Sequence, residues 1–304
     1  MSLRPPPEAR TPAELLRFGV VNLDKPPGPS AHQVSGWVRN MVDDALASVD
    51  EPGIDNAAHA GTLDPKVTGC LPVLLGEATR LAQVFLEGHK EYVAVLEVHA
   101  DVPDDLPAVA SEFEGEIYQK PPKKSAVRRD LRVREVYDLD VLETADRRAL
   151  LRIECESGTY VRKLCHDLGL ALGTGAHMGD LRRTGTDPFD DRDLVSLHDL
   201  ADALGFWRED GDAAPLREVV RPAERALRHL PSVAIAESAA REVANGAPVY
   251  APGVIEVDEA ARAADEDDLV ACFTPDGSAV CLGTMVGDPD AGSGTVVDLE
   301  RVLV

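Results

Sequence analysis

Lysine is scarce in this 304-residue chain: there are seven, and none follows Lys163. Asp and Glu total 54 against 31 Lys and Arg, a net charge of −23. Proteins that bind nucleic acid are usually basic because phosphate contacts need cations, so this balance alone argues against an RNA partner. A protein adapted to extreme salt is the second explanation, because an acidic surface keeps it soluble. At molar salt the Debye length is about 3 Å, so only close contacts with RNA would then matter.

Paired cysteines and long apolar runs are also missing. The five cysteines are scattered and form no Cys-x-x-Cys pair. They indicate reduced thiols of a cytoplasmic protein rather than a disulfide frame or a zinc site. No run of about 18 apolar residues predicts a membrane span. Residues 1–10 are proline-rich and lack the apolar region of a secretory signal, so we expect a cytoplasmic protein with no membrane contact.

Residues 58–69 form the most informative segment. They combine two glycines, two threonines, a proline and a lysine with a single carboxylate, Asp64. Turn residues fix the directions of backbone N–H groups and polar side chains. A carboxylate held rigidly in such a loop is a candidate catalytic group, because catalysis needs a positioned group. The alternative is an Asx-turn that only joins two structural elements.

Residues 61–65 (Gly-Thr-Leu-Asp-Pro) resemble the catalytic motif of the TruB-type pseudouridine synthases. Three further segments resemble motifs of the same family, in the same order: residues 23–30, 89–92 and 157–164. Residues 118–122 and 175–184 resemble the archaeal and eukaryotic branch, the dyskerin-type catalytic subunit of H/ACA ribonucleoproteins. The resemblance extends from about residue 15 to the C-terminus.

The resemblance implies a role for several side chains. Making pseudouridine means detaching uracil from ribose and rejoining it through carbon, on a base that has left the helical stack. A carboxylate can act there as a nucleophile or as the partner of a developing sugar cation. The resemblance assigns this role to Asp64, places Tyr92 over the flipped base, and pairs Arg162 with Asp64. No metal and no organic cofactor are implied.

The resemblance also assigns substrate-binding residues: His59, Tyr160 and Lys163. Other interpretations stay open for single residues. Tyr92 opens a strand and fits a core aromatic residue, Arg162 fits an ordinary helix-surface arginine, and His59 fits a capping histidine. We expect Asp24 and Lys25 to brace the catalytic loop rather than to contact the substrate.

A short basic tract stands out in so acidic a chain. Around Asp130 it contains Lys120, Lys123, Lys124, Arg128, Arg129, Arg132 and Arg134. Clustered cations of this kind predict a surface for the RNA backbone. The family places a mobile loop here that clamps substrate RNA, although its version of the tract is commonly more basic at position 130. A solvated loop is the alternative.

Sequence patterns and the resemblance together predict an α+β fold. We expect a pseudouridine synthase domain over residues 16–230, with a mixed, largely antiparallel central sheet flanked by helices and loops. Many short strand-like runs punctuated by Gly and Pro predict a small β-barrel-like domain over residues 231–304. This region resembles the PUA domain at the C-terminus of dyskerin-type enzymes. Residues 1–15 are expected to pack on that domain, as in the family.

Local patterns predict individual elements. Ser30 is a candidate N-cap for a helix carrying Val34 and Val38. Residues 92–98 fit a central strand, residues 136–142 and 149–155 a hairpin-like pair, and residues 161–172 a helix ended by glycine. Pro222 is expected to start a helix that reaches about Leu230.

The C-terminal region conflicts with an RNA-binding role. From residue 231 onward there are fourteen acidic residues and three arginines: Arg241, Arg262 and Arg301. A PUA domain that holds guide RNA should be more positive. Shape recognition and backbone hydrogen bonds at high salt are one resolution. Weak RNA binding, or a role in stabilising the fold, is the other.

The resemblance therefore implies a uridine isomerase that is guided by an H/ACA guide RNA and acts mainly on ribosomal RNA, with transfer RNA as a further possible substrate. The family implies three protein partners: a small zinc-ribbon-type subunit, a β-barrel subunit and a kink-turn-binding protein. A stand-alone synthase for the T-loop of transfer RNA is the first alternative. A non-catalytic RNA-binding scaffold is the second, and intact Asp64, Tyr92 and Arg162 argue against it.

Overall fold

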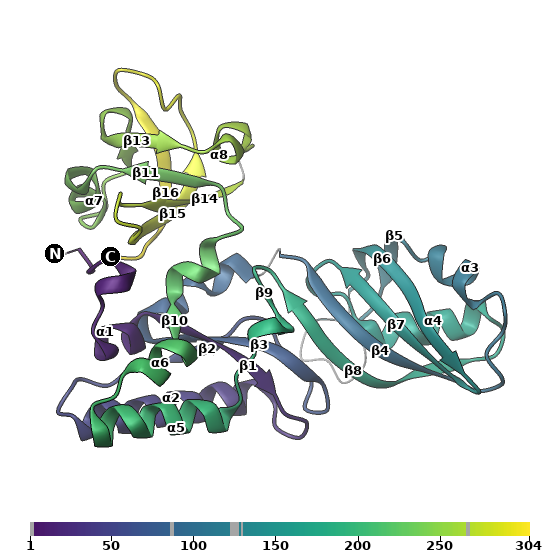
Figure 1. Cartoon of the computed structure of the whole chain (residues 1–304). Helices are drawn as coiled ribbons and strands as arrows, with labels where there is room; N and C mark the ends of the chain where they lie inside the picture. The colour runs from purple at the N-terminus through teal and green to yellow at the C-terminus, as the bar shows by residue number, and fades with distance from the viewer. Residues whose placement is uncertain (1–2, 86–87, 122–127, 129, 266–267) are drawn as a thin grey trace.

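The computed structural model describes residues 3–85, 88–121, 128, 130–265 and 268–304. The chain forms an elongated large lobe (residues 12–227) and a smaller C-terminal lobe (residues 231–304), which stands on one end of the large lobe (Figure 1). Among the described residues, each lobe is built on its own sheet, one of ten strands and one of six. This arrangement confirms the predicted α+β class with a second, mainly β domain.

The large lobe and the segment before it contain helices and strands in alternation. The α-helices are α1 (Pro12–Arg17), α2 (Ala31–Ser48), α3 (Leu106–Ser111), α4 (Val161–Ala171), α5 (Leu197–Asp210) and α6 (Ala214–Val219). The strands are β1 (Gly19–Lys25), β2 (Ala57–His59), β3 (Thr68–Leu75), β4 (Lys90–Val98), β5 (Gly115–Gln119), β6 (Arg132–Ala145), β7 (Arg148–Cys155), β8 (Ala176–Thr186), β9 (Phe189–Asp190) and β10 (Arg221–Pro222). The 3-10 helices are η1 (Pro7–Ala9), η2 (Gly76–Phe85), η3 (Asp191–Asp193) and η4 (Ala223–Leu227).

The C-terminal lobe contains shorter elements. Its strands are β11 (Ser232–Ile235), β12 (Val249–Tyr250), β13 (Val254–Val257), β14 (Leu269–Phe273), β15 (Ala279–Met285) and β16 (Thr295–Val302). Its helices are α7 (Glu237–Val243), η5 (Ala251–Gly253) and α8 (Glu259–Ala263). Short strands joined by tight turns are what the Gly and Pro punctuation predicted.

The large sheet has the strand order β10-β1-β3-β8-β4-β7-β6-β5. Its neighbours are antiparallel except for β3 and β8, which run parallel at its centre. The predicted mixed, largely antiparallel sheet is therefore confirmed. The parallel pair is close because Gly69 (φ 96°) faces β8: a Cβ there would lie 2.2 Å from the carbonyl oxygen of Arg183. The centre of the sheet is where the candidate site lies.

Helix α2 shows how local sequence sets these elements. The Ser30 side chain accepts a hydrogen bond from the backbone N–H of Gln33, and the Gln33 side chain accepts one from Ser30 in return. This capping box satisfies two N–H groups that a helix start leaves free. Val34, Val38 and Val42 then fall on one helical face and are fully buried. The predicted start at Ser30 is confirmed.

One local prediction needs correction, and one strand was not predicted. Residues 222–230 form no α-helix. Pro222 of β10 pairs with Gly19 of β1, and the 3-10 helix η4 follows it. Strand β10 adds to the sheet beside β1 and forms its edge. Helix η4 places Ala226 and Leu227 in a hydrophobic core between the lobes. Strand β8, in contrast, had no predicted counterpart. Its many polar side chains do not give the apolar pattern expected of a strand that lies between β3 and β4.

The segment before the large lobe bridges the two lobes. Buried Arg10 donates to both carboxylate oxygens of Glu224 in η4, at 2.8 and 2.6 Å. Glu224 also accepts from the backbone N–H of Ala279 in β15, at 3.2 Å. Leu3 packs on the core of the C-terminal lobe, whereas Leu15 and Leu16 belong to the core of the large lobe. The boundaries at residues 15 and 230 stay predictions.

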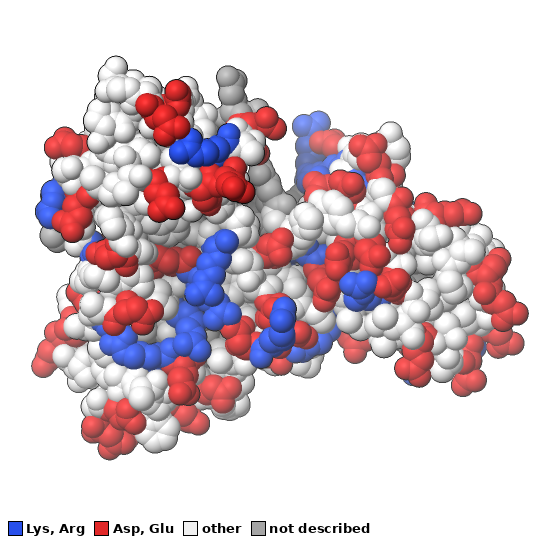
Figure 2. All heavy atoms as spheres, turned by 45° about the horizontal axis from the view of Figure 1, so that its top comes forward, with Lys and Arg blue, Asp and Glu red and all other residues white. Residues whose placement is uncertain are grey.

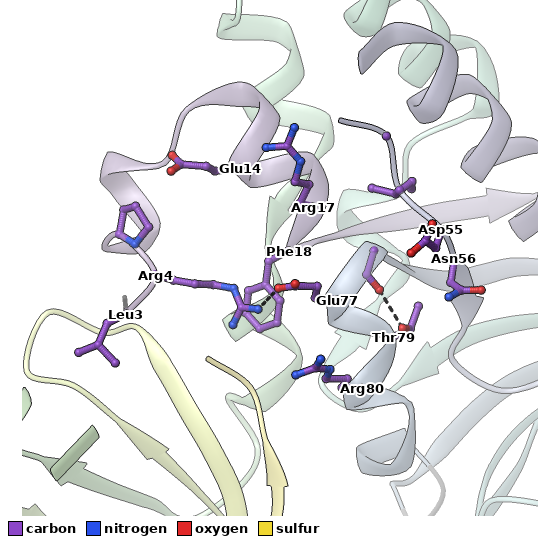
Figure 3. Close-up of a pocket in the computed structure, with 14 residues that line it drawn as sticks. Leu3, Arg4, Glu14, Arg17, Phe18, Asp55, Asn56, Glu77, Thr79 and Arg80 are labelled. Carbon is purple, nitrogen blue, oxygen red and sulfur yellow. Dashed lines mark hydrogen bonds and ion pairs between the residues drawn. The ribbon is translucent and has the colours of Figure 1, made fainter. Parts of the chain in front are cut away.

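A cavity of about 510 Å³ lies beside this bridge (Figure 3). Arg4 reaches across it from the N-terminal segment, lies 3.9 Å from the centroid of the Phe18 ring, and forms an ion pair with Glu77 of η2. Burial lowers the pKa of Arg4, and this ion pair opposes that shift. Of the site residues predicted from the sequence, none that the structure describes lines this cavity, which lies at the junction between the lobes.

Candidate active site

A buried lysine, Lys25, holds the loop that carries Asp64. Lys25 is fully buried at the end of β1, and its Nζ donates to the carbonyl oxygens of Pro26, Pro65 and Val67 at 2.9, 3.0 and 2.8 Å. All three donors of the ammonium group are thus used on backbone. Two of those bonds hold Pro65 and Val67, one and three residues after Asp64, which confirms that Lys25 braces the loop.

Arg183 holds the other side of the same loop. It is 1% exposed in β8, and its guanidinium donates to the carbonyl oxygens of Cys70 at 2.8 Å and of Ala60 and Gly61 at 3.3 Å each. Neither Lys25 nor Arg183 has a carboxylate partner in the part of the chain that the structure describes. Asp64 therefore stands on a loop fixed by two buried cations.

Asp64 forms an ion pair with Arg162, which lies in the first turn of α4. The two residues are 98 positions apart in the sequence, and both side chains are about half exposed, 50% and 42%. An exposed ion pair contributes only about 0–1 kcal/mol to stability. Its consequence here is orientation, because a guanidinium that donates to a carboxylate restricts where that carboxylate can point.

Tyr92 completes the group. It is half-buried in β4, directly opposite Arg183 of β8 on one side and Ile153 of β7 on the other. Burial raises the pKa of Tyr92, the positive charge of Arg183 opposes that shift, and the charge of Asp64 adds to it. The structure pairs Asp64 with Arg162, and it places Arg183, which binds the loop that carries Asp64, opposite Tyr92 in the sheet.

Lys90, which lies two residues before Tyr92, is a second buried lysine. It is 3% exposed, and its Nζ donates to the carbonyl oxygens of Phe85 at 3.1 Å and Gly88 at 2.8 Å. Burial, together with the charge of Arg183, lowers the pKa of Lys90 to about 8. Two of the seven lysines therefore persist where an ammonium group caps backbone carbonyls out of contact with water.

The residues predicted to bind substrate have different surroundings. Burial lowers the pKa of His59 in β2, with smaller contributions from Arg183 and His32, and in the described structure its Nδ1 is buried without a partner. Tyr160 lies just before α4, where its backbone N–H donates to Gln119 at 2.8 Å. Lys163 points along α4 to an ion pair with Asp167. That pair competes with any contact between Lys163 and RNA.

The basic tract lies partly outside the described residues, which include neither Lys123, Lys124 nor Arg129. Lys120 is exposed, and Arg132 is half-buried at the start of β6. Arg128 is 87% exposed and lies 3.0 Å from a carboxylate oxygen of Asp130. The acid at position 130 thus neutralises one cation of the tract. Its role as an RNA clamp stays a prediction.

A second basic surface was not anticipated. The arginine band, as we call it, follows α6, β10 and η4 and consists of Arg217, Arg221, Arg225 and Arg228. Arg217 and Arg221 donate to backbone carbonyls at 2.6 and 3.0 Å, and only Arg225 has a carboxylate partner among the described residues, Asp193. Figure 2 shows basic side chains gathered in such a band below the C-terminal lobe. Unneutralised arginines on so acidic a surface are suited to bind phosphate.

Sequence reasoning missed Arg183 and the arginine band. Arg182 and Arg183 lie inside a segment whose resemblance to the family was noted, but nothing in the sequence shows which of the two is buried. Arg182 in fact pairs with Asp24 at 2.9 Å on the surface. The spacing of three to four residues between the band arginines was visible, and only the fold shows that they share one surface.

We expect Arg162→Ala to lower the rate of uridine conversion by about 10²-fold, because a misplaced reacting group costs on that scale. Arg162→Lys should lose less, since it keeps a cation near Asp64. Single-turnover assays measure both. Arg148→Ala is the matched control, because it removes an exposed arginine that lies 3.4 Å from Glu97. Parental activity in Arg162→Ala would mean that Arg162 is an ordinary surface residue.

Three findings concern other functional classes. In the described parts of the chain, no group of three or more His, Cys, Asp or Glu side chains could hold a metal ion. None of the helices among those residues combines the length and apolarity needed to cross a bilayer. All five cysteines are buried and free.

Comparison with known families covers almost the whole chain. Residues 52–161 match the TruB family pseudouridylate synthase (N terminal domain), and residues 162–228 match the tRNA pseudouridylate synthase B C-terminal domain. Residues 231–291 match the PUA domain, and residues 5–35 match the DKCLD (NUC011) domain. The matches to the N- and C-terminal halves of the synthase meet between residues 161 and 162, at the start of α4.

Similar proteins span the full length. "Probable tRNA pseudouridine synthase B" of Halobacterium salinarum is 64% identical over 100% of both chains, and that of Pyrococcus abyssi is 45% identical over 98% of this chain and 87% of its own. The crystal structure of a Cbf5-Nop10-Gar1 complex matches with a TM-score of 0.89 at 44% identity, over 100% of this chain and 90% of that one. An H/ACA RNP bound to a substrate RNA containing 2'-deoxyuridine matches with a TM-score of 0.88 at 42% identity, over 99% and 90%.

These matches confirm the predicted pseudouridine synthase fold and the PUA domain, and the Halobacterium relative agrees with the halophilic interpretation of the composition. The chain therefore belongs to the TruB family of pseudouridylate synthases, enzymes that isomerise uridine in RNA, and it has the structure of the archaeal H/ACA catalytic subunit.

Proposed function

We propose that this protein is the RNA-guided catalytic subunit of an H/ACA particle, and that it isomerises chosen uridines, mainly in ribosomal RNA, with Asp64 as the catalytic carboxylate. The observation that carries the proposal is the Asp64–Arg162 ion pair on a loop fixed by Lys25 and Arg183, beside Tyr92. The likeness to H/ACA structures over the whole chain supports the guided form.

In this mechanism the bond between C1′ of the ribose and N1 of uracil breaks. Asp64 then either attacks C1′ as a nucleophile or stabilises the developing sugar cation. Arg162 keeps Asp64 oriented and ionised. Tyr92 lies on the base and takes part in proton transfer. The uracil loses a proton at C5 and gains one at N1 while the C1′–C5 bond forms, so the reaction consumes no co-reactant. His59 and Tyr160 border the nucleotide.

The guide and partner proteins follow from the same proposal. The arginine band lies where the large lobe joins the PUA domain, and three of its four arginines have no carboxylate partner in the described structure. It offers phosphate contacts that the acidic PUA domain lacks. By likeness to the Cbf5-Nop10-Gar1 complex, two small proteins bind this subunit. They correspond to the zinc-ribbon-type and β-barrel partners, and a kink-turn-binding protein completes the set.

The second candidate is a stand-alone synthase for transfer RNA. It is favoured by the relatives' names, which specify tRNA pseudouridine synthase B. Both candidates use the same chemistry and the same residues, so geometry at Asp64 does not separate them. The source of target selection does: a guide RNA in one case, and the shape of the transfer RNA itself in the other.

We expect the protein to convert a ribosomal target only when guide RNA and partner subunits are added. Activity on transfer RNA without a guide should be lower by about 10²-fold or more, because the target is then not held in place. Assays on both substrates at high salt, with and without guide, measure this, and a guide with a scrambled target sequence is the control. Efficient guide-free conversion of transfer RNA, unaffected by a guide, would support the stand-alone enzyme.

A further inference from the structure

Gln119 is a polar residue at an inward-facing position of β5. Successive side chains of a strand point to opposite faces of the sheet, and in β5 residues 116 and 118 are exposed, whereas residues 117 and 119 are more buried. Gln119 is 1% exposed, and its neighbour Tyr118 is 67% exposed. A buried amide is costly unless its polar atoms are hydrogen-bonded, so the partners of Gln119 indicate why an amide stands there.

Both polar atoms of this amide bind the backbone of Tyr160. Oε1 of Gln119 accepts a hydrogen bond from the backbone N–H of Tyr160 at 2.8 Å, and Nε2 donates to the carbonyl oxygen of Tyr160 at 3.3 Å. The two residues are 41 positions apart in the sequence. Because one side chain binds both the N–H and the C=O of a single residue, it fixes the orientation of the backbone there as well as its position.

The point that Gln119 holds is the start of helix α4. Tyr160 is the N-cap residue of α4, and in the described structure its side chain makes no capping hydrogen bond. Its carbonyl oxygen accepts from the backbone N–H groups of Lys163 and Leu164 at 2.9 and 3.0 Å, which closes the first turn. Helix ends are the least firmly held parts of a helix, because their first N–H groups lack partners within it. Arg162, the second residue of α4, forms the ion pair with Asp64 from this turn.

Strand β6, the neighbour of β5, holds the same loop at a second point. A guanidinium nitrogen of Arg134 lies 2.7 Å from one carboxylate oxygen of Glu156, and the other oxygen accepts from the backbone N–H of Glu135 at 3.2 Å. Gly158 has φ 83°, and a Cβ there would lie 3.3 Å from Nε of Arg134. Arg134 therefore faces the loop before α4, although it belongs to the basic tract in the sequence.

We propose that Gln119 and Arg134 are positioning residues for the isomerisation: they fix the start of α4 on the β5–β6 hairpin, and so place Arg162 where it orients Asp64. The inference rests on the proposed function, in which Asp64 is the catalytic carboxylate. Among the described residues β5 forms one edge of the large sheet (Figure 1), and Gln119 is its last residue, directly before Lys120 of the basic tract. Contacts of this tract with RNA are thereby linked to the geometry at Asp64.

A double-mutant cycle with Arg162 separates positioning from general support of the fold. Gln119→Met keeps the length of the side chain and removes both hydrogen bonds. We expect it to lower the single-turnover rate at saturating RNA by about 10- to 100-fold, because a misplacement of about 1 Å costs on that scale. In the Arg162→Ala background the same change should cost no more than about threefold, because it acts through the missing guanidinium. A full second loss in that background would overturn the proposal.

Arg134→Gln tests the same link at a partly exposed side chain, and it decides the matter if Gln119→Met does not fold. We expect the rate at saturating RNA to fall by about tenfold, with a loss of no more than about threefold in the Arg162→Ala background. The affinity for RNA should stay within about threefold, because Arg134 faces the loop. A loss of affinity with a parental rate at saturation would make Arg134 an ordinary phosphate contact and would overturn the proposal.

Gln83→Met is the matched control. It makes the same substitution at a half-buried residue of η2 and should change the rate less than about threefold in both backgrounds. The parental protein with guide RNA and partner subunits is assayed in parallel. If the parent does not convert uridine, the proposed function fails, whereas an active parent with additive variants contradicts only the role of Gln119 and Arg134.

Discussion

Asp64→Asn should lower the rate of pseudouridine formation by about 10⁴-fold or more, the scale on which loss of a covalent or charge-stabilising catalytic group acts. Asparagine keeps the shape of the side chain but is neither an anion nor a nucleophile toward C1′. The affinity for RNA should stay within about threefold, because the phosphate contacts that we propose lie on arginines elsewhere. Single-turnover conversion and filter binding at the same salt concentration measure the two quantities.

The effect should be specific to position 64. Asp55→Asn makes the same charge change on an exposed loop residue and should leave the rate within about threefold. Folding is not at issue, since the ion pair with Arg162 is half exposed and contributes about 0–1 kcal/mol. Conversion by Asp64→Asn at the parental rate would show that another group performs the chemistry.

Removing salt should have the second large effect. Lowering salt from about 1 M to about 0.1 M lengthens the Debye length from about 3 Å to about 10 Å, so the charges behind a net −23 begin to repel one another. We expect the midpoint of thermal unfolding to fall by on the order of 10 °C or more, which corresponds to a few kcal/mol for a protein of this size. Calorimetry across a salt series measures it.

Charge neutralisation provides the control for the salt effect. Glu242, Glu256 and Glu300 are exposed in the PUA domain, where acids outnumber arginines fourteen to three. A triple change to Gln should reduce the salt dependence of the midpoint while leaving its high-salt value within a few degrees. A parent that unfolds at the same temperature in dilute and in molar salt would contradict the halophilic interpretation.

The proposed catalytic group could be named from the sequence because its chemistry lies in short motifs. Asp64 and Tyr92 belong to segments in which the type of side chain is itself the signal. Helix α2 could also be predicted from the sequence. Its N-cap, Ser30, and the helical spacing of Val34 and Val38 are both local features. In each of these cases, neighbours in sequence determine the structure, and no long-range contact has to be known.

What escaped prediction depends on partners distant in sequence. Pro222 does not start the predicted helix because it pairs with Gly19 of β1, about two hundred residues earlier in the chain. Strand β8 was missed because its arginines do not give the pattern expected of a strand in the interior of a sheet. There Arg183 donates to carbonyl oxygens of residues more than a hundred positions away. The inner position of Arg183 and the outer one of Arg182 are properties of the assembled sheet.

The surviving lysines illustrate both cases. Lys25, Lys90 and Lys163 lie within the segments that resemble family motifs. The structure gives the physical reason for two of them: Lys25 and Lys90 are buried, and their ammonium groups bind only backbone carbonyls. An ammonium group is a compact donor to several oxygens at once, whereas a planar guanidinium is larger and has a different geometry.

The most direct test of the account is a structure of the Asp64→Asn protein in its particle, with guide RNA and an unconverted target uridine. We expect the target nucleotide outside the helical stack, its base against the Tyr92 ring, and its C1′ about 3–3.5 Å from the side chain at position 64, as a reacting pair requires. A target uridine that stays stacked in the helix, or that enters a site away from Asp64 and Tyr92, would contradict the account.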